Sequence, residues 1–199
     1  MSVTKELRFE CVRCGKCCID KNTIVNITYF DIIRLYTKLK LNIDELIHIL
    51  GFYIFKQSLS KEFLSKMVIS PVNTEKGSAF VGLRKLENHH CFFFNDKNKE
   101  CKIHNIRPDI CRAFPFSFFN NKNQEINIIY TEKGKQYCVG INENSPIINE
   151  HKLKDFANKF LNVLKKNEDI IKDWNNNISK IKQKSSVRNF LKYLLDLEL

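Results

Sequence analysis

The sequence predicts an α+β protein, with a small cysteine-rich metal-binding core of short strands and helices and a C-terminal helical extension. The first 146 residues hold all eight cysteines, mixed with short strand-like and helix-like patterns. Residues 147–199 contain no cysteine, glycine or proline, and their apolar residues recur at helical spacing. We therefore divide the chain into a cysteine-cluster metal-binding domain, residues 1–146, and a helical extension packed on it, residues 147–199.

Two consecutive helices are expected over residues 28–50, between the two groups of cysteines. Each has the residues of a capping box, in which a polar side chain and an acidic side chain three residues later bond to each other's backbone amides. The two boxes are Thr28 with Asp31 and Asn42 with Glu45. Gly51 is expected to end the second helix, because glycine adopts the left-handed backbone of a helix C-terminus without strain.

Short apolar runs predict the strands of the cysteine-rich half. Extended structure is expected at residues 7–10, 24–27, 67–70, 79–83, 90–94 and 126–130. Residues 95–99 are polar and predict a turn, and Gly134 predicts another. Pro108 and Pro115 bracket a short helix. Two or three helices are expected beyond residue 146, with a polar break at residues 175–177.

Length, charge and the N-terminus narrow the class of protein. No apolar run approaches the roughly 20 residues that span a bilayer, and residues 1–10 lack the apolar core of a signal peptide. We therefore expect a cytoplasmic protein with no membrane association, in a compartment where thiols stay reduced. The net charge of +11 comes from lysines spread along the chain, and no RNA-binding motif is present, so nucleic-acid binding is not expected.

Half of the cysteines fall within one eight-residue stretch, and the other four follow at wide spacing. We expect both groups to close on one metal-binding core, because soft thiolates select zinc, iron–sulfur clusters or Cu(I). The expected metal ligands are Cys11, Cys14, Cys17, Cys18, Cys91, Cys101, Cys111 and Cys138.

The cysteine spacing is compatible with more than one metal. Cys11-x2-Cys14-x2-Cys17 matches the first three ligands of a bacterial ferredoxin cluster, and a Cys-x2-Cys pair also forms the knuckle of a structural zinc site. Isolated buried thiols and disulfides are weaker alternatives, since eight cysteines at this spacing are not expected by chance and no secretion signal is present. The expected cofactor is therefore an iron–sulfur cluster, for example [4Fe–4S], or zinc.

Cys17 and Cys18 are adjacent, and this bears on the number of metal sites. In extended backbone, neighbouring side chains point to opposite faces. Ligation of one tetrahedral ion by both thiols would then need an unusual bend. We hypothesise that the two thiols serve different sites, so that eight cysteines form two four-thiolate centres.

Three other residues are expected beside the cofactor: Arg107, Arg112 and His104. A tetrathiolate zinc site or a [4Fe–4S]²⁺ cluster carries a formal charge of about −2, which guanidinium groups stabilise. Arg107 precedes Cys111 by four residues and shares its face if the segment is helical. His104 is a candidate ligand or proton donor, although a lone histidine is more often a local hydrogen-bonded residue. No catalytic residue is assigned.

Three stretches of the sequence form a combined motif between about residues 7 and 141. They read Phe9-x-Cys11-x2-Cys14-Gly15-x-Cys17-Cys18, then Cys91-Phe92-Phe93, then Cys101-x-Ile103-His104-x2-Arg107-Pro108-x2-Cys111-Arg112-x-Phe114-Pro115, with Cys138 following. This motif resembles the YkgJ-type cysteine-cluster family. The resemblance implies a zinc- or iron-chelating domain, and some members are described as iron–sulfur oxidoreductases.

The same cluster is found in flagellin lysine N-methylase. That resemblance implies an iron–sulfur centre used in protein methyl transfer from S-adenosylmethionine. This sequence has no Gly-rich nucleotide loop after a clear strand. Its own features therefore support metal binding more than methyl transfer.

We expect an iron–sulfur protein with a redox or redox-assisted catalytic role. The alternative is a zinc-stabilised structural module without catalysis, whose C-terminal helices dock a protein partner. Both hypotheses place metal at the eight cysteines.

Overall fold

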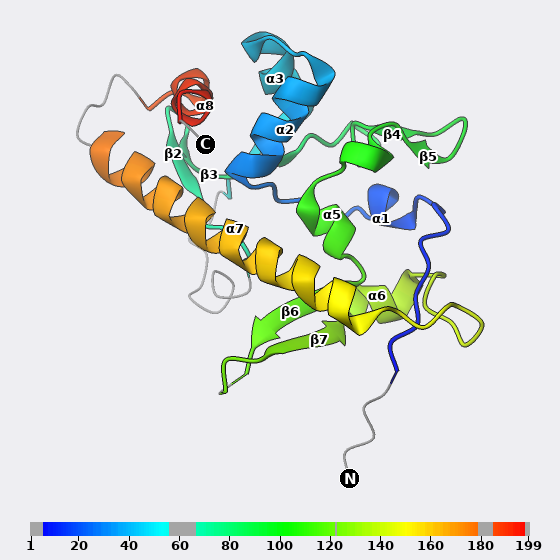
Figure 1. The fold of residues 1–199 in the computed structure, drawn as a ribbon. Helices are drawn as coiled ribbons and strands as arrows, with labels where there is room; N and C mark the ends of the chain where they lie inside the picture. Colours follow the sequence, from blue (N-terminus) through cyan, green and yellow to red (C-terminus); the bar gives the residue numbers. More distant parts are fainter. Residues whose placement is uncertain (1–5, 56–66, 122, 179–184, 198–199) are drawn as a thin grey trace.

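The computed structural model of the chain is a mixture of helices and short antiparallel strands (Figure 1). It describes residues 6–55, 67–121, 123–178 and 185–197. The α+β class expected from the sequence is confirmed. Within these residues, no helix is both long enough and apolar enough to cross a membrane.

The elements follow one another as short helices and strands, and the longest helix comes near the end. The helices are α1 (Lys16–Ile19), α2 (Tyr29–Leu39), α3 (Ile43–Ile49), the 3-10 turn η1 (His104–Ile106), α5 (Asp109–Ala113), α6 (Glu132–Tyr137), α7 (Glu150–Ile178) and α8 (Val187–Leu195). The strands are β1 (Leu50–Tyr53), β2 (Val72–Thr74), β3 (Gly77–Leu83), β4 (Phe94–Asn95), β5 (Glu100–Cys101), β6 (Phe116–Asn120) and β7 (Ile126–Tyr130). An antiparallel sheet has the order β1-β3-β2, and β4-β5 and β6-β7 are two-stranded.

The two helices expected over residues 28–50 are α2 and α3, and both capping boxes are confirmed. In the first box, the backbone amide of Asp31 donates to the Thr28 hydroxyl at 3.2 Å, and the Thr28 amide donates to the Asp31 carboxylate at 2.9 Å. The expectation for Gly51 is wrong. The backbone becomes extended at Leu50, which is the first residue of β1. Gly51 follows within this strand and pairs with Gly82 of β3.

Several of the expected strands are confirmed. Residues 79–83 and 126–130 fall within β3 and β7. Residues 25–27 lie beside β3, since Ile27 donates to the Val81 carbonyl at 3.2 Å and Leu83 donates to the Val25 carbonyl at 2.9 Å. The lead-in strand at residues 7–10 is extended, and its backbone pairs with residues 140–148.

Other local expectations are wrong because tertiary contacts override the local pattern. Residues 67–70 form a bend, and most of residues 90–94 form a turn closed by a 2.8 Å bond from the Phe94 amide to the Cys91 carbonyl. The polar turn at residues 95–99 is confirmed as the β4-β5 connection. Gly134 lies inside α6 rather than in a turn.

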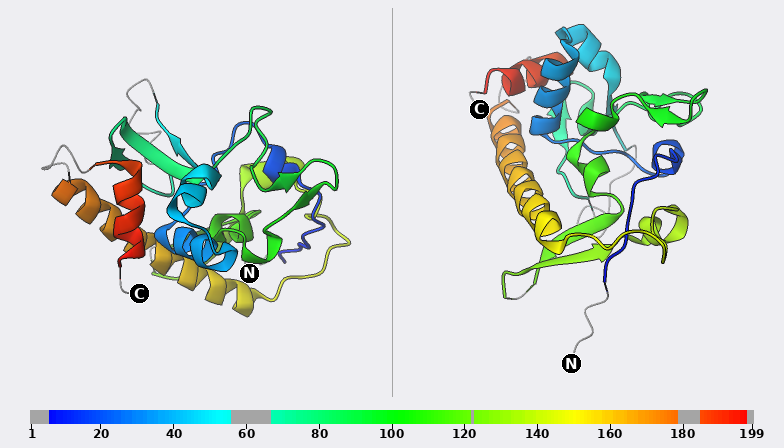
Figure 2. Two further views of the ribbon diagram at one scale, coloured as in Figure 1. Left: turned by 90° about the horizontal axis from the view of Figure 1, so that it is seen from above. Right: turned by 45° about the vertical axis from the view of Figure 1, so that its right-hand side comes forward.

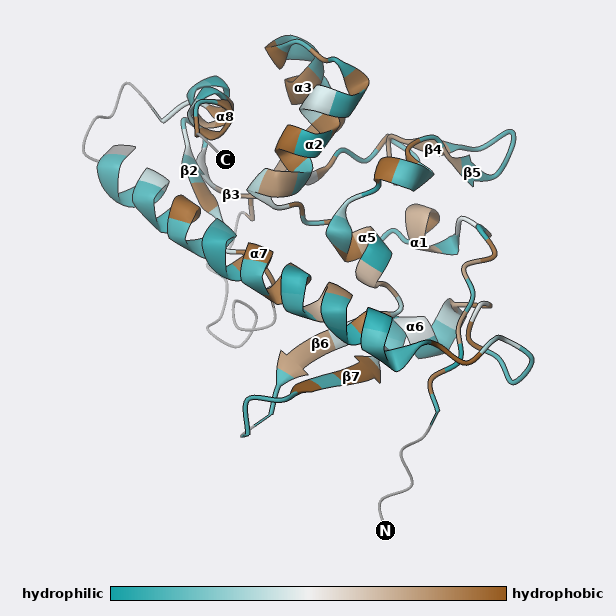
Figure 3. Cartoon of the chain, viewed as in Figure 1, coloured by the Kyte–Doolittle hydropathy of each residue, from teal (hydrophilic) through white to brown (hydrophobic). Residues whose placement is uncertain are grey.

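The long helix α7 joins the two ends of the molecule, running from the β6-β7 hairpin to β2 and α8 (Figures 1 and 2). Hydrophobic residues recur along it between hydrophilic ones (Figure 3). Near its start, Ala157 and Phe160 pack with Phe116 and Phe118 of β6. Near its end, Trp174 belongs to the main hydrophobic core. One helix thus contributes to both hydrophobic clusters.

The polar break expected at residues 175–177 does not occur, because α7 continues through it. The Asn175 side chain explains this. It accepts a hydrogen bond from the Asn73 amide at 2.8 Å and donates one to the Pro71 carbonyl at 3.0 Å. Trp174 adds a bond from its indole nitrogen to the Asn73 carbonyl at 3.0 Å. The end of α7 is therefore attached to the edge of the sheet.

Trp174→Ala is expected to lower the free energy of unfolding by about 3–5 kcal/mol, since the indole is fully buried and its removal leaves a large cavity. Chemical denaturation of the metal-replete protein measures the change. Phe119→Ala is the control, because this aromatic ring of β6 is 44% exposed and should cost far less. Equal losses for the two variants would contradict the role given to the end of α7.

Candidate metal centre

The first cysteine group forms a tight knuckle. Arg13 and Gly15 both have left-handed backbone, with φ of 53° and 73°, and α1 starts directly after Gly15. A Cβ atom on Gly15 would lie 2.3 Å from the Phe94 ring, so glycine is required here for space as well as for backbone conformation.

Cys17 and Cys18 lie within α1. The expectation that they occupy extended backbone is therefore wrong, and their side chains are not forced onto opposite faces. A hydrogen bond joins the two thiols. Cys18 also reaches toward the later cysteines, because its thiol bonds to Cys101 and its carbonyl accepts the Cys91 amide at 2.8 Å.

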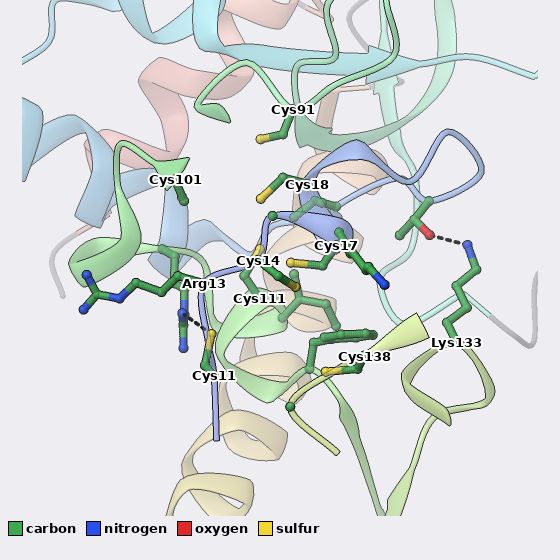
Figure 4. A pocket seen from close by; sticks show the side chains of 18 of the residues that line it. Cys11, Arg13, Cys14, Cys17, Cys18, Cys91, Cys101, Cys111, Lys133 and Cys138 are labelled. Carbon is green, nitrogen blue, oxygen red and sulfur yellow. Dashed lines mark hydrogen bonds between the residues drawn. The ribbon is translucent and has the colours of Figure 1, made fainter. Parts of the chain in front are cut away.

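The four later cysteines come from separate elements. Cys91 follows β3, Cys101 ends β5, Cys111 lies in α5 and Cys138 caps the C-terminus of α6. Together with the knuckle they surround one cavity of about 730 Å³, which all eight thiols line (Figure 4). The structure therefore brings together every cysteine that the sequence nominated.

Gly140 helps to close this cavity behind Cys138. The Gly140 carbonyl accepts a 3.1 Å hydrogen bond from the amide of Glu10, just before the knuckle. A Cβ at Gly140 would lie 2.1 Å from the Glu10 carbonyl oxygen. The close approach of the two backbones sets Cys138 beside the first cysteines.

The thiols at one end of the cavity are in hydrogen-bond contact with one another. Bonds from Cys18 lower the pKa of Cys101 to about 6 and that of Cys17 to about 7, and they raise the pKa of Cys18 itself. A lowered thiol pKa favours the thiolate, which is the form that binds metal. Cys17 and Cys101 therefore ionise more readily than an ordinary thiol.

Other thiols are held protonated by their surroundings. Burial raises the pKa of Cys91 to about 11, and it also raises the pKa of Cys111 and Cys138. Neighbouring cysteines add to these shifts. Binding of a soft cation would have to displace these protons, so metal affinity at this site must depend on pH.

Arg107 and His104 both line the cavity. The Arg107 guanidinium donates toward the Cys11 sulfur at 3.9 Å and also bonds to the His104 ring. The ring nitrogen Nε2 of His104 is 3.8 Å from the same sulfur. Burial, followed by the charge of Arg107, lowers the pKa of His104 and favours its neutral form.

Arg112 lies away from the cavity lining. Its guanidinium bonds to Asp109 at 3.4 Å and covers the Phe156 ring of α7 at 5.2 Å. Phe114, by contrast, lines the cavity and stacks on Tyr137 at a centroid distance of 5.7 Å. Phe116 packs in the core beside Phe9 and Tyr130.

Thr23, Lys133 and Tyr137 form a polar cluster on the cavity wall that was not predicted from the sequence. All three bond to the Asp20 carboxylate, and the Lys133 ammonium lies 2.6 Å from it. Lys133 also donates to the Thr23 hydroxyl, which is the bond drawn at Lys133 in Figure 4. Although burial opposes it, bonding to Lys133 and Thr23 keeps the pKa of Asp20 below its usual range. The one sequence signal for this cluster is the spacing of Lys133 and Tyr137, which are four residues apart just before Cys138 and so share one face of a helix.

The donor set fits a soft metal. Within the described ranges, no three His, Cys, Asp or Glu side chains converge as the shell of a single ion. The thiols are distributed instead along the cavity, with Cys91 and Cys18 toward one end and Cys11 and Cys138 toward the other (Figure 4). The cavity therefore presents soft donors along its whole length.

A protein-family model described as "CxxCxxCC: Putative zinc- or iron-chelating domain" matches residues 10–139. The chain belongs to the CxxCxxCC family. The match covers the knuckle and all four later cysteines, so the family resemblance expected from the motif is confirmed. The description of the family as a zinc- or iron-chelating domain supports metal binding by this chain.

A curated relative of this CxxCxxCC protein is an uncharacterized protein of Methanocaldococcus jannaschii. The two are 27% identical over 135 residues, which cover 68% of this chain and 59% of the relative. The chain thus spans less than two thirds of that relative's length. No solved structure matches the chain.

Cys14→Ser is expected to lower both bound metal and stability, because a hydroxyl is a poor ligand for a soft metal and the metal joins segments far apart in sequence. Metal analysis and thermal unfolding measure the two losses. Val12→Ser is the control, since this exposed knuckle residue carries no donor atom for a soft metal. A folded Cys14→Ser variant with its full metal content would show that Cys14 is not a ligand.

Proposed function

We propose that this CxxCxxCC protein is an iron–sulfur protein with a redox or redox-assisted catalytic role. One observation carries the proposal: all eight thiols line a single cavity that is much larger than one metal ion needs. Structural zinc sites are closed tetrahedral shells. This cavity has the size of a small-molecule site, and Cys11, Cys14 and Cys17 are exposed.

The cysteines divide between two centres in this proposal. Burial is the main cause of the raised pKa of Cys138. The charges of the nearby thiols Cys11, Cys14 and Cys17 raise it further. Cys18 bonds to both Cys101 and Cys17, and Cys91 and Cys111 each have Cys17 as well as Cys101 among their charged neighbours. We therefore assign Cys11, Cys14 and Cys138 to the first centre and Cys18, Cys91 and Cys101 to the second, with Cys17 and Cys111 between them.

A bound iron–sulfur cluster would supply one-electron chemistry at this cavity. The protein would supply charge and shape. Arg107 places a positive charge beside Cys11, which stabilises a more reduced and therefore more negative cluster. Phe114 and Tyr137 wall the cavity with stacked rings, and Lys133 adds a cation that can orient an anionic reactant.

The zinc-stabilised module is the second candidate. The left-handed backbone at Arg13 and Gly15 favours it, because a compact knuckle suits a structural zinc shell. Docking of a partner through the C-terminal helices belongs to this candidate. The apolar residues Trp174, Phe190 and Leu194 of those helices pack within the protein's own core, so docking would have to use other faces.

The test is purification without oxygen, followed by analysis of iron, zinc and labile sulfide. The proposal expects a brown protein with broad visible absorption, two centres per chain and a reduced form detectable by electron paramagnetic resonance. A colourless protein with stoichiometric zinc and no sulfide would favour the second candidate. Iron and sulfide sufficient for one cluster only would overturn the two-centre division.

A further inference from the structure

A buried ion network lies behind the cavity, on the side of α2. The Arg34 guanidinium bonds to the carboxylates of Asp31, at 2.5 Å, and Asp109, at 3.0 Å. The side chains of Asp31, Asp109 and Arg34 are 1%, 9% and 15% exposed. Removal of any one of these three side chains would leave a charge buried and unpaired, which destabilises the folded protein.

The same guanidinium also binds backbone next to the cavity. Arg34 donates from Nη2 to the Arg107 carbonyl oxygen at 2.9 Å, and Asp31 accepts the Asp109 amide at 2.9 Å. Both ends of the short joint between η1 and α5, residues 107–109, are therefore held from α2. The Nε atom of Arg34 is buried and makes no hydrogen bond to the described residues, so its two Nη atoms set its orientation.

This joint carries groups that face the thiols. The Arg107 side chain leaves it toward Cys11 and His104. The first turn of α5 leads from it to Cys111, whose amide bonds to the Pro108 carbonyl at 2.9 Å. Any change in the path of residues 107–109 moves a cation and a thiol of the proposed metal site together.

We propose that Arg34 is a positioning residue of the metal centre. It acts through the Arg107 main chain and holds the Arg107 guanidinium beside Cys11, which sets the charge around that thiolate. Arg34 bonds to three acceptors: the carboxylates of Asp31 and Asp109 and the Arg107 carbonyl. A planar guanidinium can bond to all three, whereas a lysine ammonium cannot reproduce this arrangement. The inference rests on Cys11 being a ligand, as in the proposed function, but holds for either metal.

Arg112 offers a matched control within the same network. It bonds to the same Oδ1 atom of Asp109 as Arg34 does, at 3.4 Å, but its side chain is 50% exposed and packs over Phe156. It has no bond to the Arg107 backbone in the described structure. A role that is only structural, through Asp109, would make Arg34 and Arg112 respond alike.

The experiment compares Arg34→Lys, Arg34→Met, Arg107→Met and Arg112→Met in the metal-loaded full chain. Reduction potential is measured on the anaerobically isolated protein, and the Co(II) d–d and thiolate charge-transfer bands are measured after metal replacement. Metal content and thermal unfolding are recorded for each variant. Co(II) is added to the apoprotein, so its spectrum reports on the thiolates of the site whether the native metal is iron or zinc.

We expect Arg34→Lys to keep the wild-type metal content and to shift the Co(II) bands in the same direction as Arg107→Met. The potential of both variants should become more negative, because a positive charge that stabilised the reduced centre is lost or displaced. Arg112→Met should match the wild type. If Arg34→Met does not fold, Arg34→Lys still decides the question.

The inference is overturned if Arg34→Lys retains the wild-type spectrum while Arg107→Met shifts it, or if Arg112→Met shifts it equally. A protein that holds zinc and has no reduction potential would instead defeat the proposed iron–sulfur function. The Co(II) bands would still test Arg34 in that case, so the two failures are distinguishable.

Discussion

Eight thiols that face one cavity cannot all ionise there unless cations share the space. The thiolates would repel one another, and burial already raises the pKa of Cys91 and Cys111. A bound soft metal removes this conflict, because it replaces the protons and neutralises the sulfur charge. Groups around the cavity favour this replacement of thiol protons by metal. The hydrogen bonds of Cys18 hold Cys17 and Cys101 close to ionisation, while Arg107 lies against Cys11.

Eight thiols from separate elements must be held around one cavity, and several contacts far apart in the sequence hold them there. The knuckle and the later cysteines come from separate elements, none of which has enough apolar surface to fold alone. Two kinds of connection hold them. The Arg34 network fixes the joint before α5 to the N-terminal turn of α2, and α7 packs against both the β6 cluster and the main core. The C-terminal helices therefore pack in the same hydrophobic clusters as the cysteine-rich part of the chain.

Much of the local structure could be predicted because its causes lie close together in sequence. The capping boxes at Thr28 and Asn42 and the strand at residues 126–130 depend on neighbours a few residues away. The expectations that proved wrong had distant causes. Gly51 enters a strand because β3 pairs with it, and residues 91–94 turn where the Cys91 amide bonds to the distant Cys18 carbonyl. Asn175 stays helical because Asn73 and Pro71 provide partners about a hundred positions away.

The sequence by itself determined the chemistry of this protein: eight soft donors, their grouping into a knuckle and a distant set, and the cations near Cys111. Donor type is a property of each side chain, so it can be read without a fold. Only the tertiary structure decided which groups share the cavity. It placed Arg107 beside Cys11 and Arg112 away from the cavity, although the two lie five positions apart. It also brought Lys133 and Tyr137 to the cavity wall, since such contacts depend on how α5 and α6 pack and not on spacing along the chain.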